Sequence, residues 1–403
     1  MNVAARREGA QTSAAEPVYL DHNATTPVAH AVVAEMIDAL ERTWANPSST
    51  HGPGQAARRL LVDARARVAA FLGCQGAELV FTSGATEANH MAVLGVLAAA
   101  RPGPRRRLVL SAVEHPGLLA LAQRLRAEGT PVDLIPVDAQ GRVDLAAAAD
   151  LVADDVALVS VMGANNETGV LMPTAALAAI AHAHGALLHV DATQLVGKSH
   201  LKFHASGADL MSVSAHKLSG PKGIGALLVR KGIDLPPLLA GRQERNRRGG
   251  TENLPGIAGF AAACELAGRE LAPNIERMTS LRRRLEEGLA DSLPAVHLYG
   301  RDAERLPNTA CMRFGTLESE QVLGRLERAG IVASSGAACT ASGTQPSHVL
   351  LAMGESVEHA KASVRFSLGS ETAAAEIERT IDAARRVIGP LLGTADEGTA
   401  LAA

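Results

Sequence analysis

A lysine and an aspartate in this chain follow apolar runs that are typical of buried strands. Lys217 lies just beyond LMSVSA (210–215), and Asp191 follows the apolar run ALLHV. Desolvation at the end of a buried strand can lower the pKa of a lysine, and a neutral amine can form a Schiff base. A buried carboxylate is costly when it is unpaired, so Asp191 implies a cationic partner. The pair therefore suggests a site that holds both a carbonyl group and a cation.

Residues that could bind a phosphate follow strands of the same kind. Ala85 and Thr86 open a helix after ELVFTS, and small residues at a helix N-terminus leave backbone N–H groups open to an anion. Ser214 and His216 flank the strand end before the lysine. Taken singly, each residue has a plain structural explanation, such as a helix cap. Because ligands bind at the carboxyl ends of strands in α/β sheets, their convergence on one edge favours a pyridoxal phosphate site.

Seven short apolar runs predict the strands that position these residues. Most are continuously apolar rather than alternating, which is typical of strands buried on both faces. Segments between them, such as LLALAQRLRAEG and TAALAAIAHAHG, repeat apolar residues at helical spacing and end in Gly. The alternation predicts an α/β fold with a mainly parallel sheet covered by helices. The expected strands are 78–83, 107–113, 132–137, 156–162, 186–192, 210–215 and 225–231.

The character of the sequence changes after about residue 265. A long charged helix, NIERMTSLRRRLEEGLADSL, precedes strand-like CMRF and IVASSG and helices around 319–329 and 373–389. This order predicts a second, smaller α+β domain. We interpret residues 1–17 as a disordered leader and residues 391–403 as a flexible tail.

Composition argues against several classes of partner. The 403 residues carry 39 Lys+Arg and 42 Asp+Glu, a net charge of −3, whereas nucleic-acid-binding proteins usually present a basic face. Six Phe, two Tyr and one Trp are few for stacking on bases. No run reaches the roughly 20 apolar residues of a membrane span, and the N-terminus lacks the apolar core of a secretory signal. We expect a cytoplasmic protein with no nucleic-acid or membrane partner.

The cysteines predict neither a disulfide framework nor a metal site. The four are widely spaced and include no CxxC pair. A reducing compartment is the natural interpretation. The four positions are Cys74, Cys264, Cys311 and Cys339.

The segment Val196-Gly197-Lys198-Ser199 ends like a phosphate-binding P-loop. That motif would require a glycine at position 192, which is Ala192, and a glycine-rich loop before it, which is absent. We therefore assign no nucleotide site to this segment.

Motifs that occur together in one enzyme family recur in order along the chain. They are YLDHNATTPV (19–28), NPSSTHGPGQAAR (46–58), FTSGATEAN (81–89), VEHPG (113–117), SVMGANNETG (160–169), HVDATQLVGK (189–198), SVSAHKLSGPKGIGAL (212–227), QERNRRGGTEN (243–253), LPNTA (306–310), SSGAACTASGTQPSHVL (334–350) and VRFSLG (364–369). With these motifs the sequence resembles the cysteine desulfurases of the class V aminotransferase fold, from about residue 18 to 390. The long tract around Cys339 resembles the branch that serves iron–sulfur assembly, including the nitrogen-fixation type.

The resemblance implies an aminotransferase-like fold of type I. A mainly parallel seven-stranded sheet would form a large cofactor-binding domain at 28–265. Residues 18–27 and 266–390 would form a small α+β domain that carries the Cys339 loop. The resemblance also implies a homodimer.

The resemblance further implies pyridoxal 5'-phosphate as the cofactor and gives its ligands individual roles. Lys217 would form the Schiff base and shuttle the Cα proton, while Asp191 would pair with the ring nitrogen. His115 would stack on the ring, and Gln194 would reach the ring oxygen. The expected cofactor-binding residues are Ala85, Thr86, His115, Asn166, Asp191, Gln194, Ser214, His216 and Lys217, with Thr251 reaching in from the partner subunit.

The implied reaction removes sulfur from L-cysteine. Asn166 and Arg365 would position the substrate, Arg365 through a forked contact with its carboxylate. The thiolate of Cys339 would attack the substrate sulfur and leave a persulfide on the protein and L-alanine as product. A tract of small and polar residues around this cysteine suits a thiol that must collect sulfur and hand it on. The implied partners are a sulfur acceptor or an iron–sulfur scaffold protein.

Three other functions compete with this interpretation. An aminotransferase of the same fold would have no need of Cys339. A non-catalytic scaffold in a sulfur-transfer assembly would have no need to keep Lys217 and Asp191 together with that cysteine. A selenocysteine lyase is harder to exclude, because exchanging sulfur for selenium leaves every contact unchanged.

Overall fold

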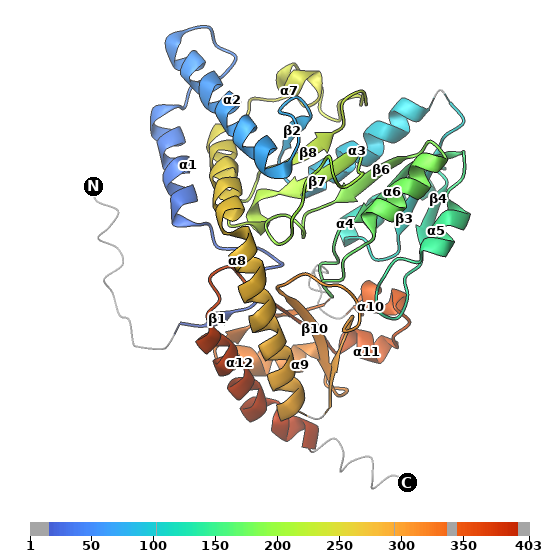
Figure 1. The fold of residues 1–403 in the computed structure, drawn as a ribbon, viewed down its shortest axis with the longest axis vertical. Helices are drawn as coiled ribbons and strands as arrows, with labels where there is room; N and C mark the ends of the chain where they lie inside the picture. Colours follow the sequence, from blue (N-terminus) through green and yellow to red (C-terminus); the bar gives the residue numbers. More distant parts are fainter. Residues whose placement is uncertain (1–15, 102, 294, 337–344, 394–403) are drawn as a thin grey trace.

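A seven-stranded sheet forms the centre of the larger part of the molecule (Figure 1). The computed structural model describes residues 16–101, 103–293, 295–336 and 345–393. The strands of this sheet are β2 (Leu79–Thr82), β3 (Arg107–Ser111), β4 (Val132–Ile135), β5 (Val156–Met162), β6 (Leu187–Asp191), β7 (Leu210–Ser214) and β8 (Gly225–Val229).

The strand order confirms the expected α/β fold. Across the sheet the order is β2-β8-β7-β6-β5-β3-β4, and β8 runs in the opposite direction to the other six strands. Each strand lies within one of the seven apolar runs. The runs are continuously apolar because helices cover both faces of the sheet, so alternate residues enter different cores. Leu79 and Phe81 of β2 belong to one apolar cluster, and Val80 between them belongs to the other.

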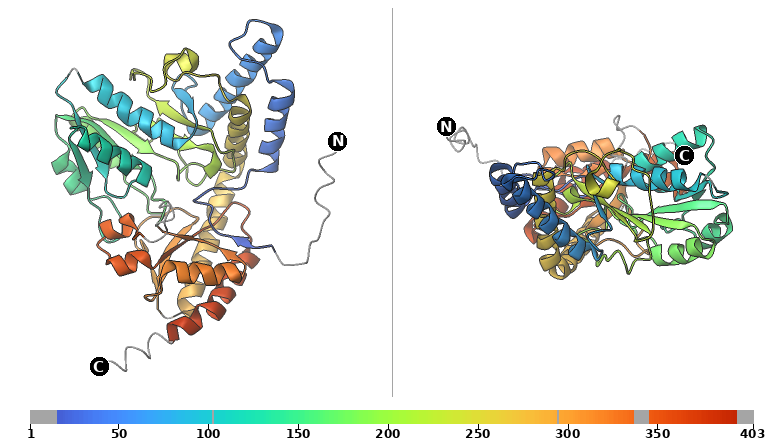
Figure 2. Two further views of the ribbon diagram at one scale, coloured as in Figure 1. Left: turned by 180° about the vertical axis from the view of Figure 1, so that it is seen from behind. Right: turned by 90° about the horizontal axis from the view of Figure 1, so that it is seen from above.

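Helices on the two faces enclose the sheet (Figure 2). One face packs against α3 (Ala85–Ala100) and α4 (Pro116–Ala127). The other packs against α1 (His30–Arg42), α2 (Gly52–Leu72), α5 (Leu145–Leu151), α6 (Thr174–Ala183) and the first half of α8 (Leu254–Ser292). The short helices η2 (Ala215–Lys217) and α7 (Gln243–Asn246) lie in the connections.

A smaller sheet follows in the C-terminal part of the chain. Its order is β12-β13-β10-β9, all antiparallel, and a separate strand pair joins β1 to β11 in parallel. It packs against the second half of α8 and two further helices in a core of its own. The elements are β1 (Val18–Tyr19), β9 (Val296–Leu298), β10 (Thr309–Phe314), β11 (Ile331–Val332), β12 (Ser334–Ser335), β13 (Ser363–Ser367), α9 (Ser319–Arg328), α10 (His348–Ala352), α11 (Val357–Lys361) and α12 (Ala374–Val387).

Helix α8 begins earlier than the sequence pattern predicts. The charged segment is its second half, and the beginning of the helix, Leu254–Cys264, is almost wholly buried. Pro273 lies inside the helix. The change of character near residue 265 therefore falls within a helix that runs from the large sheet to the small one. We propose 28–265 and 18–27 plus 266–390 as the two domains, with α8 as their shared element.

The described residues contain no helix with the length and apolar character needed to cross a membrane. The same residues contain no cluster of three or more ligands that could hold a metal ion. Cys264 and Cys311 are buried and Cys74 is half-buried; all three are free thiols. Cys339 lies outside the described residues.

Three polar side chains on the neighbouring strands β5, β6 and β7 form a buried row of hydrogen bonds in the large sheet. His189 on β6 is fully buried, with Nδ1 at 2.8 Å from Ser160 Oγ and Nε2 at 2.9 Å from Ser212 Oγ. Burial lowers the pKa of His189 to about 4, against a smaller opposing effect of Asp191. The imidazole is therefore neutral in the folded protein at physiological pH.

This neutral histidine makes the fold sensitive to acid. Below its ordinary pKa of about 6.5 the unfolded chain takes up a proton that folded His189 refuses until about pH 4, so stability falls as the pH falls through that window. Between pH 6.5 and 5 the loss is about 2 kcal/mol. His189→Gln should remove that part of the pH dependence of the free energy of unfolding in urea. His30→Gln, at an exposed position, is the control. An unchanged pH dependence in the His189 variant would contradict this account.

Candidate active site

A cavity of about 450 Å³ lies between the carboxyl edge of the large sheet and the small sheet. The large sheet contributes residues that follow β2, β3, β5, β6 and β7, and the small sheet contributes a residue of β13. Every described residue that the sequence nominated lines this cavity, except Thr251. They are Ala85, Thr86, His115, Asn166, Asp191, Gln194, Ser214, His216, Lys217 and Arg365.

One end of the cavity is built to bind an anion. Helix α3 begins there after Gly84, and no side chain of the described residues caps its first turn. Gly225 on β8 allows the loop to approach, because a Cβ there would lie 2.8 Å from the Cα of Gly84. The uncapped N–H groups of the helix therefore face the cavity beside the Thr86 and Ser214 hydroxyls.

His216 adds a neutral imidazole to this end. Burial, together with the charges of Lys217, Lys222 and Lys198, lowers its pKa to about 4. Its Nδ1 lies 3.2 Å from Thr25 Oγ1. A neutral ring can donate one hydrogen bond into the site without adding charge to it.

Asp191 ends β6 and is held by uncharged donors. Asn89 Nδ2 donates to Oδ2 at 2.7 Å, and the backbone N–H of Thr193 donates to Oδ1 at 3.0 Å. The carboxylate is buried. Its position on the cavity wall leaves it facing whatever the cavity binds.

Lys217 closes the helical turn η2 and extends to the segment that follows β1. Its Nζ donates to the carbonyl oxygens of Asn23 and Ala24, the latter at 2.8 Å. The amine is thus held at the cavity wall by two neutral acceptors.

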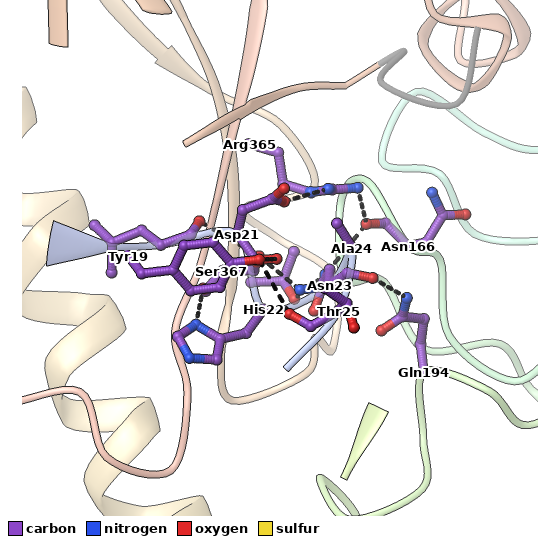
Figure 3. A network of polar contacts seen from close by, with 12 residues as sticks. Tyr19, Asp21, His22, Asn23, Ala24, Thr25, Asn166, Gln194, Arg365 and Ser367 are labelled. Carbon is purple, nitrogen blue, oxygen red and sulfur yellow. Dashed lines mark hydrogen bonds and ion pairs between the residues drawn. The ribbon is translucent and has the colours of Figure 1, made fainter. Parts of the chain in front are cut away.

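Asn23 connects this amine to the rest of the site, and Figure 3 shows Asn23 between Gln194 and Asn166. Its carbonyl also accepts from Gln194 Nε2 at 3.0 Å, and its side-chain amide donates to the carbonyl oxygen of Asn166 at 3.2 Å. The same amide nitrogen donates to Thr309 Oγ1 on β10 at 2.9 Å. One buried asparagine therefore links residues at the edge of the large sheet to the small sheet.

His115 stands where α4 begins. Its Nδ1 accepts from the Gly117 N–H at 3.1 Å, and burial lowers its pKa, so the ring stays neutral. The preceding Glu114 is wholly buried, and burial raises its pKa to about 8. Its Oε1 accepts from the Met162 N–H at 2.8 Å. A protonated Glu114 thus fixes the strand end from which His115 projects.

Arg365 brings a cation to the cavity from β13. It is 2% exposed; Nη2 contacts Asp21 Oδ1 at 2.7 Å, and Nη1 donates to the Asn166 carbonyl at 3.1 Å. Its Nε has no partner among the described residues. Asp21 does not line the cavity, so the ion pair holds the guanidinium from behind.

Two nominated residues lie elsewhere. Thr251 is exposed and lines a neighbouring depression with Arg248, not the main cavity. Cys339 falls in 337–344, outside the described residues. The sequence interpretation missed Asn23, Asn89 and Asp21, although all three lie within the quoted motifs.

The cavity fits pyridoxal phosphate. An anion end, a buried carboxylate and an amine lie on its walls, as a phosphate, a ring nitrogen and an aldehyde require. Asn166 Oδ1 and Thr193 Oγ1 are buried on these walls without a hydrogen-bond partner among the described residues. Buried polar atoms of this kind are normally satisfied, so a polar ligand is the simplest explanation for them.

Comparison with known proteins agrees with this geometry. The model of the aminotransferase class-V family matches residues 18–380. The chain belongs to this family. Cysteine desulfurases of Cereibacter sphaeroides and Rhodobacter capsulatus are 46% and 45% identical to it, over 91% and 90% of this chain and 94% of each relative.

Solved structures of the family share the fold. A NifS-like protein superposes with a TM-score of 0.86 at 34% identity, covering 92% of this chain and 99% of that one. The structure titled "SspA in complex with cysteine" gives a TM-score of 0.77 at 30% identity, covering 88% and 100% of the two chains.

Removing Asp21 should show how strongly the site depends on this ion pair. Asp21→Ala leaves the Arg365 guanidinium buried without its carboxylate, so we expect a loss of about 3 kcal/mol in the free energy of unfolding. Asp382→Ala, which removes the exposed pair with Arg385, should cost less than about 1 kcal/mol. Equal losses of unfolding free energy in urea would show that the buried ion pair stabilises the protein no more than the exposed one.

Proposed function

We propose that this protein is a pyridoxal-phosphate-dependent cysteine desulfurase, which converts L-cysteine to L-alanine and places the sulfur on Cys339. The observation that carries the proposal is the meeting of Lys217 and Asp191 in one cavity with the open N-terminus of α3. The identities of 41–46% with cysteine desulfurases support the choice of reaction.

The cofactor would be held at three points. The first turn of α3 at Ala85 and Thr86, with Ser214 and His216, would bind the phosphate. Asp191 would keep the ring nitrogen protonated, and Asn89 would hold that carboxylate in place. The remaining proposed contacts are His115 on the ring face, Asn166 and Gln194 at the ring edge, and Thr251 from the partner subunit.

When bound, pyridoxal phosphate supplies an electron-withdrawing ring that makes the substrate Cα–H acidic. Lys217 would bond the carbonyl group, release it to the substrate amine and then move the Cα proton as general base and acid. The neighbouring Asn23 and Ala24 carbonyls would receive the amine once it is released.

Arg365 and Asn166 would select the substrate carboxylate. The guanidinium already faces the cavity, and its Nε has no partner among the described residues. Asn166 lies beside it, because its backbone carbonyl accepts from Arg365 Nη1. Binding by a rigid fork beside a neutral amide favours an α-carboxylate over a neutral group.

Sulfur would leave the substrate by attack of the Cys339 thiolate. An S–S bond forms as the Cβ–S bond of the substrate breaks, and the carbon product leaves as L-alanine after taking up protons. Burial raises the pKa of Cys74 to about 12 and raises those of Cys264 and Cys311, so these thiols are poor nucleophiles.

A homodimer would complete the site. Val33, Ile37 and Leu40 form an apolar stripe along α1, and they are 38%, 48% and 58% exposed. Trp44 continues it at 73% exposure. A stripe of this kind is typical of a surface buried by another protein. A second copy on this face would also give the exposed Thr251 a role.

The proposed acceptor of the persulfide is a sulfur-carrier or iron–sulfur scaffold protein. The proposed location is the cytoplasm, where thiols stay reduced, because the reaction requires Cys339 as a thiol.

Lys217→Ala tests the cofactor site. The variant should be colourless or hold pyridoxal phosphate only non-covalently, and it should form no alanine from cysteine, since the amine held at the Asn23 and Ala24 carbonyls is then missing. Absorbance near 420 nm and alanine assay measure the two effects. Lys222→Ala, which changes another lysine on the cavity wall, is the comparison. Normal alanine production by the Lys217 variant would refute the assignment.

Cys339→Ser separates cofactor binding from sulfur removal. The variant should keep the yellow cofactor and its spectral response to L-cysteine, yet release almost no sulfide or alanine, because a hydroxyl is a weak nucleophile at neutral pH. In the wild type, alkylation after cysteine treatment should trap a persulfide at this residue. Desulfuration by the variant at the wild-type rate would favour a lyase that needs no protein thiol.

A further inference from the structure

Lys198 is buried beside the active site without a counter-ion. It lies in the turn after β6 and is 5% exposed. Its Nζ donates to Gln194 Oε1 at 2.7 Å and to Asn23 Oδ1 at 3.1 Å, and it forms no ion pair with a carboxylate of the described chain. Burial, together with the charges of Lys217 and Arg365, holds its pKa well below the ordinary value. Burying a lysine without a counter-ion destabilises the folded protein. Its presence beside the cavity therefore suggests a functional role.

The partners of Gln194 fix which way its amide faces. A protonated lysine can only donate, so the atom beside Lys198 Nζ is Oε1 when the lysine carries its charge. A backbone carbonyl can only accept, so the atom beside Asn23 O must be Nε2. Both partners therefore impose the same orientation, and one N–H of Nε2 has no partner among the described residues.

That N–H belongs to a side chain on the cavity wall. Gln194 lines the cavity, whereas Lys198 lies behind it and lines a second, smaller space of about 180 Å³ with His22, Glu270 and Glu371. Lys198 can therefore influence a ligand in the main cavity only through Gln194, through Asn23 or by its charge.

We propose that Lys198 is a positioning residue that fixes Gln194 with its N–H, rather than its oxygen, toward the ring oxygen of pyridoxal phosphate. The inference rests on the proposed function, since it requires that cofactor in the cavity. The ring oxygen is an acceptor when it is ionised, so an N–H would stabilise it and an amide oxygen would repel it. Without the lysine, Oε1 is left without its donor, so the amide keeps only the Asn23 carbonyl of the two partners that hold this orientation.

A ligand that lacks the ring oxygen isolates this effect. The protein freed of cofactor is titrated with pyridoxal 5'-phosphate and with 3-deoxypyridoxal 5'-phosphate, and the ratio of the two Kd values is measured. Both ligands keep the phosphate, the ring nitrogen and the aldehyde, so changes at Lys217 affect them alike. A loss of positive charge alone would act on the ionised ring oxygen, and Lys222→Met controls for that effect because it removes a charge from the cavity wall. We expect the wild type to prefer the natural ligand at least tenfold.

The variants should change this ratio in a defined pattern. Lys198→Met should bring it below threefold. Gln194→Glu keeps an acceptor for Lys198 but offers no N–H, and should abolish the preference. Lys222→Met changes another lysine on the cavity wall that has no contact with Gln194, and should keep the wild-type ratio.

Each result decides one claim. A wild-type ratio in folded Lys198→Met would overturn the positioning role, even if both affinities fall together. If that variant does not fold, Lys198→Gln, whose amide offers both a donor and an acceptor, should give an intermediate ratio, and an unchanged ratio would overturn the role. Failure of the wild type to bind either ligand would refute the proposed function instead.

Discussion

Three cationic side chains converge on the short segment that follows β1, and the geometry of the site depends on this convergence. Lys198 and Lys217 donate to Asn23, and Arg365 pairs with Asp21. Each cation is removed from water to some degree, so each needs acceptors in the protein. The segment supplies backbone carbonyls, one amide and one carboxylate within the four positions 21–24. Its hydrogen bonds to Asn166 on one side and to Thr309 and Ser367 on the other place it between the two sheets.

The geometry of the cavity therefore depends on how the two sheets are placed relative to each other. Asn23 donates to Asn166 on the large side and to Thr309 on the small side, and its backbone N–H donates to Ser367 on β13 at 2.9 Å. A shift of the small sheet would therefore displace groups that hold Lys217 and Gln194. The pairing of β1 with β11 fixes the start of the segment. The segment that follows β1 therefore holds the groups around Lys217 and Gln194 in a fixed position relative to the small sheet.

The sequence predicts the large sheet well for a physical reason. Strands buried on both faces are apolar throughout, so they stand out as continuous apolar runs. Ligand-binding residues in such sheets follow the strands, and the residues after these runs include Lys217, Asp191 and Thr86. The start of α8 is missed because Leu254–Cys264 is buried almost all round and has no polar face. Without alternation at helical spacing, the pattern carries no signal for a helix.

The missed site residues are those whose roles depend on distant partners. In the sequence, Asn89 is an ordinary residue of a predicted helix. Only the fold places it beside Asp191, which is 102 positions away. Asn23 lies in an ordinary polar segment, and its contacts with Asn166 and Thr309 span 143 and 286 positions. Local spacing says nothing about such pairs. The role of Cys339 rests on its sequence context and its chemistry, since it lies outside the described residues.

The central claim is that Lys217, among the lysines around this cavity, bonds the carbonyl group of the cofactor. Borohydride reduction of the protein loaded with pyridoxal phosphate, followed by digestion and mass spectrometry, locates that bond directly. The account predicts a single pyridoxyl group on Lys217. A group on Lys198 or Lys222, or no covalent group at all, would contradict it.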